Sequence, residues 1–343
     1  VMHQMGLGGF FMHSRVGLDT AYMSEDWMKC TRACIDEARR LNMRAWLYDE
    51  DRWPSGAAGG LVTRDPRWRR RMLVMRELSG PRELKWTRQT IAAFTARVKA
   101  DSVSDVRRLA RGKRPKKLET GESILCFDVE LDSCSSWYNG YTYLDTLNPE
   151  AVKRFIEVTH EAYGEQFREF FGKTVPGMFT DEPNHGACMQ PVDGTVSVPW
   201  TDRLPAVFRE RYGYDLVPHL PELFLDPAGR EVSKPRVDYH DCATFLFVDA
   251  FARRIGEWCE RNRMQHTGHV LAEESLSSQS CKVGSALRFY EYMQAPGMDI
   301  LTEYRREYET AKGVSSVARQ FDRKWRRTET YGCTGWDFPF MGH

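Results

Sequence analysis

The sequence lacks an excess of charge of either sign. Its 343 residues carry 49 Lys and Arg against 48 Asp and Glu, which gives a formal net charge of +1 at pH 7. Proteins that attract nucleic acid or anionic membranes through their overall field need a clear basic excess, so we expect neither partner. No apolar run approaches the ~18 residues of a membrane span, and the first residues lack the layout of a signal peptide.

Cysteine is present but follows no recognisable pattern. The nine cysteines are odd in number, irregularly spaced and free of any Cys-x-x-Cys pair. Zinc ribbons and disulfide frameworks both predict tighter spacing, so we expect neither. Mostly reduced thiols indicate a cytoplasmic protein. If a signal peptide once preceded Val1, the periplasm or the cell exterior is the alternative.

One segment departs from the neutral balance of charge. Between Arg82 and Lys117 there are twelve basic residues and three acidic ones. A surface that binds nucleic acid would add exposed aromatic side chains to such a run. Only Trp86 and Phe94 are available, at positions typical of a strand core, so we interpret the run as a solvated basic face.

The dominant pattern is a short apolar strand, a polar loop and an amphipathic helix, repeated along the chain. With 41% hydrophobic and 12% aromatic residues, there is ample material for a large core. Seven segments are predicted as strands, namely 6–12, 43–48, 141–147, 177–180, 265–271, 297–301 and 327–331. Strands that alternate with helices predict a parallel sheet. Ser24 and Asn148-Pro149 are typical of helix starts.

The expected architecture is a (β/α)₈ TIM barrel of the α/β class, with seven units visible and the eighth missing. Residues 78–133 break the rhythm because polar and apolar residues alternate there, which predicts a small antiparallel β insertion. The expected domains are therefore a catalytic barrel of residues 1–77 and 134–343 and an inserted subdomain of residues 78–133.

Polar side chains gather where the predicted strands end. In a (β/α)₈ barrel the active site is built from the carboxyl ends of the strands, and six of the seven strands deliver carboxylates, imidazoles or aromatic rings there. The candidates for binding substrate are His13, Asp49, Glu50, Asp51, Trp53, Asp181, His185, His269, Tyr292, Tyr331, Trp336 and Asp337. Trp53, Tyr292, Tyr331 and Trp336 could offer flat faces to the C–H surfaces of a sugar.

Glycoside hydrolysis explains these residues economically. It needs one carboxylic acid to protonate the leaving oxygen and a second carboxylate as nucleophile or as base for water. Glu182, in Phe179-Thr180-Asp181-Glu182-Pro183, is the first candidate for the acid; its alternative role is to stabilise the next helix. Glu329 and Glu273 compete for the second role, with Glu329 slightly ahead.

A metal site is a weaker interpretation of the same residues. His266-x-x-His269 lacks the spacing and the third ligand that define zinc. Residues three apart on a strand point to opposite faces, so hydrogen bonding to substrate is the better interpretation of the histidines. The acidic residues near the strand ends would suit Ca²⁺ and sugar hydroxyls equally well. No cofactor is required, and the metal is left unassigned with Ca²⁺ as a possibility.

Six segments together resemble bacterial glycoside hydrolases related to α-L-rhamnosidases. The segments are Gly8–Arg15, Trp46–Gly56, Phe179–Pro183, Pro199–Thr201, Arg211–Leu216 and Glu329–Phe338, and the resemblance covers almost the whole chain. The resemblance implies a barrel catalytic domain that is normally followed by β-sandwich domains, and a calcium-dependent, inverting reaction with two glutamates. Glu182 matches the acid, and the base carries over to Glu273 or Glu329.

Three alternatives remain open at this point. A retaining exo-β-glycosidase would use the same barrel, with its carboxyl groups ~5–5.5 Å apart rather than ~6.5–9.5 Å. A non-catalytic glycan-binding protein would keep the cleft without turnover. A barrel isomerase or aldolase would need a phosphate-binding glycine loop or a lysine at a strand end, and the sequence offers only the thin candidate Gly332–Gly335.

Overall fold

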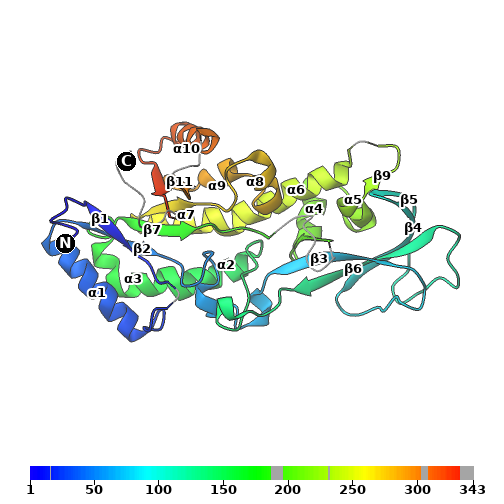
Figure 1. Ribbon diagram of the computed structural model, residues 1–343, viewed down its shortest axis with the longest axis horizontal. Coiled ribbons are helices and arrows are strands. Elements are labelled where there is room, and N and C mark those ends of the chain that lie inside the picture. Colours follow the sequence, from blue (N-terminus) through cyan, green and yellow to red (C-terminus); the bar gives the residue numbers. More distant parts are fainter. Residues whose placement is uncertain (16, 187–195, 231, 303–307, 333–343) are drawn as a thin grey trace.

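The computed structural model describes residues 1–343 except 16, 187–195, 231, 303–307 and 333–343. Two six-stranded sheets account for the strands of this part of the chain. They lie towards opposite ends of the long axis of the molecule (Figure 1). One sheet is entirely parallel and the other is mainly antiparallel, so the fold belongs to the α/β class.

The parallel sheet has the strand order β1-β2-β7-β10-β11-β12. Its members are β1 (Gly9–Met12), β2 (Arg44–Tyr48), β7 (Gly177–Asp181), β10 (Gln265–His269), β11 (Ala295–Ile300) and β12 (Arg327–Thr330). Each pair of neighbours is parallel. All six carboxyl ends therefore lie along one edge, where such sheets bind their ligands.

Ten α-helices of the described residues flank or follow these strands. They are α1 (Glu25–Arg40), α2 (Pro149–Ile156), α3 (Ala162–Phe167), α4 (Leu204–Tyr212), α5 (Leu220–Phe224), α6 (Lys234–Phe247), α7 (Arg254–Arg261), α8 (Leu276–Lys282), α9 (Ala286–Tyr290) and α10 (Tyr308–Gln320). As expected, Ser24 caps α1 and Asn148 caps α2 with Pro149 in the first turn. None of the helices in these residues is long and apolar enough to cross a membrane.

The helical layers meet in an aromatic core. Phe155 of α2 stacks on Phe251, with ring centroids 5.9 Å apart, and Phe247 of α6 lies 5.1 Å from Phe289 of α9. All four rings are fully buried. Two π-helical turns, Glu157–Glu161 and Val248–Arg253, continue α2 into α3 and α6 into α7.

The second sheet has the order β8-β3-β6-β4-β5-β9. Its strands are β3 (Arg71–Leu78), β4 (Thr90–Lys99), β5 (Ser102–Arg108), β6 (Glu122–Leu131), β8 (Val196–Trp200) and β9 (Asp226–Pro227). The antiparallel strands expected between residues 78 and 133 are present. The sheet starts earlier, at Arg71, and also takes in β8 and β9 from later in the chain. Phe94 lies in its core, as its strand position predicts.

One predicted strand is wrong. Residues 141–147 do not join the parallel sheet; β2 pairs directly with β7, through Leu47 with Met178 and Tyr48 with Phe179. The segment is buried, but it hydrogen-bonds to the stretch before β3, where the amide of Arg70 donates to Tyr143 O at 3.0 Å. Burial on both sides produces the same apolar pattern as a central strand, which is why periodicity misled here. The described residues thus contain six parallel strands instead of seven.

Gly268 fixes how closely β10 approaches β7. Its φ is +123°, and a Cβ at this position would lie 1.9 Å from Thr180 O. No residue with a side chain fits such a contact without moving the backbone. The close approach matters for the site because β7 carries Asp181 at its end and β10 carries His269.

Gly268→Ala is expected to lower the free energy of unfolding by about 3 kcal/mol or more, from backbone strain together with the clash. Urea unfolding measures the loss. Gly213→Ala is the matched control: Gly213 also has a positive φ, +80°, but nothing lies within 4 Å of its added Cβ. We expect the control to lose about 1 kcal/mol. Equal losses in the two variants would contradict the importance of the contact with Thr180.

Candidate active site

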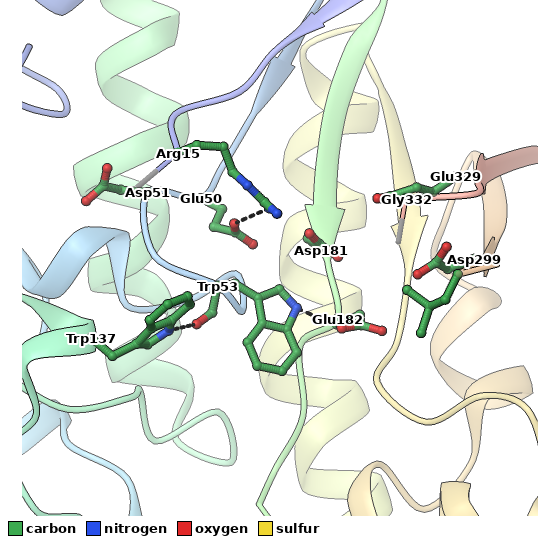
Figure 2. A pocket seen from close by; sticks show the side chains of 11 residues that line it. Arg15, Glu50, Asp51, Trp53, Trp137, Asp181, Glu182, Asp299, Glu329 and Gly332 are labelled. Atoms are coloured by element: carbon green, nitrogen blue, oxygen red, sulfur yellow. Dashed lines mark hydrogen bonds and ion pairs between the residues drawn. The ribbon is translucent and has the colours of Figure 1, made fainter. Parts of the chain in front are cut away.

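A cavity of about 580 Å³ opens at the carboxyl edge of the parallel sheet. Its volume is in the range of sites that take small ligands. Residues from the ends of β1, β2, β7, β11 and β12 line it, and Trp137 joins them from the segment after β6 (Figure 2). The lining is Arg15, Glu50, Asp51, Trp53, Trp137, Asp181, Glu182, Asp299, Leu301, Glu329 and Gly332. Six carboxylates therefore face one cavity.

Glu182 follows directly after β7. Its φ is +46°, a left-handed conformation that is uncommon for a residue with a side chain and is worth explaining at a functional position. Its amide donates to His269 O at 3.0 Å, and the indole Nε1 of Trp53 donates to its Oε2 at 2.7 Å. Burial raises the pKa of Glu182 to about 7. The side chain thus holds a proton near neutral pH, beside an open cavity.

The surroundings of Glu329, near the end of β12, favour its charged form, whereas those of Glu182 favour the neutral acid. His269 Nε2 lies 3.4 Å from its Oε2 and 3.6 Å from Oδ1 of Asp181. The hydrogen bond from His269 holds the pKa of Glu329 below its usual value. Burial lowers the pKa of His269, but Glu329, Asp181 and other carboxylates outweigh it and raise the value to about 10. Glu329 is therefore a carboxylate next to an imidazolium.

Glu50 and Asp181 also line the cavity. His13 Nε2 lies 3.0 Å from Glu50 Oε1, and its ring stacks on Tyr48 with centroids 3.7 Å apart. Tyr48 donates to Asp181 Oδ2 at 2.7 Å. Burial and the charge of Asp181 raise the pKa of Glu50 well above its usual value. Such buried, mutually repelling carboxyl groups are costly and are typical of functional sites.

Asp49 hydrogen-bonds to residues beside the site but does not line the cavity. It is fully buried and accepts from Ser55 Oγ at 2.6 Å and from Thr180 Oγ1 at 2.7 Å. Ser55 also accepts from the amide of Asp181 at 2.8 Å and donates its own amide to Asp181 O at 2.8 Å. Asp49 therefore connects the loop after β2 to the end of β7, and burial raises its pKa to about 7.

Glu273 lies outside the cavity. Its carboxyl accepts from the hydroxyl of Tyr290 and, at 2.6 Å, from the amide of Asp299. Burial raises its pKa to about 7. Glu273 thus fixes the backbone of β11 at the point where Asp299 enters the cavity.

The structure distributes the predicted site residues as follows. Glu50, Asp51, Trp53, Asp181, Glu182 and Glu329 line the cavity, and His13 and His269 contact that lining. The other described candidates, Asp49, His185, Glu273, Tyr292 and Tyr331, do not line it. Trp336 and Asp337 lie outside the described residues.

Two of the residues outside the lining have clear surroundings of their own. His185 is buried against Phe247, with ring centroids 5.7 Å apart, and burial lowers its pKa to about 3. Burial and the charge of Glu291 raise the pKa of Tyr292, and the charges of Arg253, Asp249 and Glu257 also act on it. These three belong to the helical layer of Val248–Arg253 and α7.

Five lining residues were not selected from the sequence, namely Arg15, Trp137, Asp299, Leu301 and Gly332. Arg15 stands in the predicted end of the first strand, and its Nη1 lies 4.0 Å from Glu50 Oε1. Asp299 lies within a predicted strand, one residue before β11 ends, so only an exact strand register could have placed it at the rim. Trp137 donates to Trp53 O at 2.5 Å, a contact across 84 residues that no local pattern announces.

The described donor atoms do not form a calcium site. Two groups have donor atoms within 4.8 Å of one another: Asp181, His269 and Glu329, and Glu182, His269 and Asp299. Calcium takes six to eight oxygen ligands. Each group offers two carboxylates and the same imidazole, which is fewer oxygen ligands than calcium takes. We therefore derive no step of the chemistry through a metal.

Comparison with solved structures reveals a fold likeness to a rhamnosidase. A rhamnosidase from Novosphingobium sp. PP1Y superposes with a TM-score of 0.60 at 13% identity, covering 96% of this chain and 49% of that one. A polyextremophilic beta-galactosidase from the Antarctic haloarchaeon Halorubrum lacusprofundi gives a TM-score of 0.41 at 13% identity, over 89% and 38% of the two chains. No protein-family model and no curated protein sequence matches.

The chain spans about half the length of the rhamnosidase. At this identity the likeness shows that the two share a fold, and it leaves the choice of substrate and mechanism to the residues of the cavity.

Proposed function

We propose that the protein is a glycoside hydrolase that cleaves a terminal sugar, of the α-L-rhamnoside type, from a glycan by inversion. We also propose that the parallel sheet is part of a (β/α)₈ barrel. The fold likeness to the rhamnosidase supports both proposals. In this proposal Glu182 is the general acid and Glu329 the base that activates water.

One observation carries the proposal: two carboxyl groups that line the same cavity have pKa values shifted in opposite directions. Burial raises the pKa of Glu182 to about 7, whereas the hydrogen bond from His269 lowers that of Glu329. Glycosidases need one carboxylic acid and one carboxylate at the same pH, and environments that push two pKa values apart assign the roles. Trp53 and Trp137 would supply aromatic faces for the sugar.

The acid delivers its proton to the glycosidic oxygen as the bond to the leaving group breaks. Glu329 takes a proton from a water that attacks the anomeric carbon from the opposite face. His269 remains protonated throughout and stabilises Glu329 as a carboxylate before the attack. Arg15, Glu50 and Asp181 lie where they can hydrogen-bond the hydroxyls of the sugar ring.

A second candidate is a retaining hydrolase with Asp299 as nucleophile. Carboxyl oxygens of Glu182 and Asp299 lie within 4.8 Å of each other, which is close to the short separation that retaining enzymes use. Asp299 would then attack the anomeric carbon, and Glu182 would act first as acid and then as base.

Proton NMR of the products tests both mechanisms with the full chain. The substrates are a panel of 4-nitrophenyl glycosides that includes the α-L-rhamnopyranoside. We expect hydrolysis of that member, with the β-anomer of the free sugar appearing first. The α-anomer appearing first would replace inversion by the retaining mechanism. Absence of hydrolysis across the panel would overturn the enzyme proposal in favour of a glycan-binding protein.

The raised pKa of Glu182 and the lowered pKa of Glu329 predict a bell-shaped dependence of kcat/KM on pH. Activity should fall above about pH 7, where Glu182 loses its proton. It should fall again at acidic pH, below the ordinary range of a glutamate, where Glu329 gains one. Initial rates on the best substrate of the panel measure the profile. A rate that still rises above pH 8 would contradict the role of Glu182 as the acid.

A further inference from the structure

The side chain of Trp53 does more than line the cavity. Its indole Nε1 donates to Oε2 of Glu182 at 2.7 Å, and Figure 2 shows the bond reaching across from the loop after β2 to the end of β7. Among the described residues, Trp53 is the one whose side chain donates a hydrogen bond to this carboxyl. The two partners lie 129 positions apart in the sequence, so the fold alone brings them together.

The loop that carries Trp53 is held on both sides. Trp137 Nε1 donates to the carbonyl of Trp53 at 2.5 Å. Two residues further on, Ser55 exchanges two backbone-directed hydrogen bonds with Asp181, both at 2.8 Å. Asp181 is the neighbour of Glu182. The same loop therefore hydrogen-bonds to the backbone at the end of β7 and to the carboxyl of the acid. The position of the indole is therefore set by the backbone on either side of it.

The chemistry of the donor decides where the proton of the acid resides. An indole N–H can donate a hydrogen bond but cannot accept one. Oε2 of Glu182 must therefore act as acceptor whether the carboxyl is charged or neutral. In the neutral acid the carbonyl oxygen accepts better than the hydroxyl oxygen, so the bond to Oε2 favours the proton on the other oxygen, Oε1. Figure 2 shows the oxygen that is not bonded to Trp53 pointing towards the side of the cavity where Asp299 lies.

We propose that Trp53 is the positioning residue of the acid: its N–H occupies Oε2 of Glu182 and so presents the proton on Oε1 to the leaving oxygen of the substrate. This inference rests on the acid role proposed for Glu182. It gives Trp53 a part in proton transfer in addition to the sugar-stacking face that its ring offers.

The charged groups around Glu182 set the background for a test. Asp181 on β7, Asp299 on β11 and Tyr290 on α9 face it, and His269 on β10 supplies a positive charge. Burial and the two aspartates favour the neutral acid, whereas His269 and the bond from Trp53 favour the charged form. Removing the indole N–H should therefore raise the pKa of Glu182. Loosening the loop and admitting water would lower it.

Trp53→Phe keeps an aromatic ring for the sugar and removes the donor. We expect the alkaline limb of kcat/KM to move up by about one pH unit, the size expected for one hydrogen bond to a charged group. We expect kcat to fall about tenfold because the proton is no longer directed, a part of the general-acid contribution. Trp325→Phe is the control: it also removes an indole N–H, but its ring lies outside the cavity, so its alkaline limb should stay in place.

A substrate-free measurement separates this inference from the proposed function. Protonation of Glu182 should change the tryptophan fluorescence of the protein near pH 7, because the indole of Trp53 bonds to it directly. The transition should disappear in both Trp53→Phe and Glu182→Gln, and it should persist in Trp325→Phe, whose ring lies outside the cavity. A transition that survives in Trp53→Phe, or an alkaline limb that stays or moves down, would overturn the positioning role. Failure of hydrolysis with an intact fluorescence pattern would overturn the proposed function alone.

Discussion

Glu182→Gln is expected to lower kcat on an alkyl glycoside by about 10³-fold, within the range of general-acid contributions. The amide keeps the shape of the side chain and can still accept from Trp53, but it has no proton to give. A leaving group that needs little protonation should suffer less, so the loss on a 2,4-dinitrophenyl glycoside should be at most about tenfold. Steady-state rates on the two substrates measure the contrast.

The matched control is Glu274→Gln. Glu274 is an exposed glutamate that does not line the cavity, so its variant should keep the wild-type rate on both substrates. Binding of the sugar product to Glu182→Gln, followed by calorimetry, should remain close to that of the wild type. Equal losses on the good and the poor leaving group would argue that Glu182 positions the substrate and does not protonate it.

The parts of the fold that follow from local chemistry could be predicted from the sequence. Ser24 and Asn148 cap helices where expected, and six of the seven apolar segments form parallel strands. The prediction for segment 141–147 failed because its apolar pattern comes from burial beside the stretch before β3, which periodicity cannot distinguish from a central strand. The strand β8 was missed because it joins a sheet formed by residues more than a hundred positions earlier.

The candidate site likewise contains residues that local sequence patterns predicted and residues that they did not. Glu50 and Asp181, which follow predicted strands, and Glu329, near the end of one, were found because the carboxyl ends of parallel strands meet at one edge. Asp299 was missed because it precedes the end of its strand, and its entry into the cavity depends on register. Tyr292 was selected as an aromatic ring near a strand, but it precedes β11 and lies at the helical layer.

The choice between Glu329 and Glu273 was open in the sequence, and the two residues have different surroundings in the structure. Glu329→Gln is expected to lower kcat by about 10³-fold with little change in KM, because the amide cannot take a proton from water. Glu273 accepts from Tyr290 and from the amide of Asp299 and does not line the cavity. Glu273→Gln should therefore keep kcat within about tenfold of the wild type.

Glu273→Gln, which should lose less activity, should lose more unfolding free energy than Glu329→Gln. A glutamine at position 273 turns an N–H group towards one of two buried donors, so about 1–3 kcal/mol of unfolding free energy should be lost. Glu329 is half-exposed at the cavity, and its replacement should change stability less, since His269 keeps Asp181 as a partner. Kinetics combined with urea unfolding on both variants decides the assignment. A Glu273→Gln variant that stays folded but loses activity 10³-fold, beside an active Glu329→Gln, would transfer the role of base to Glu273.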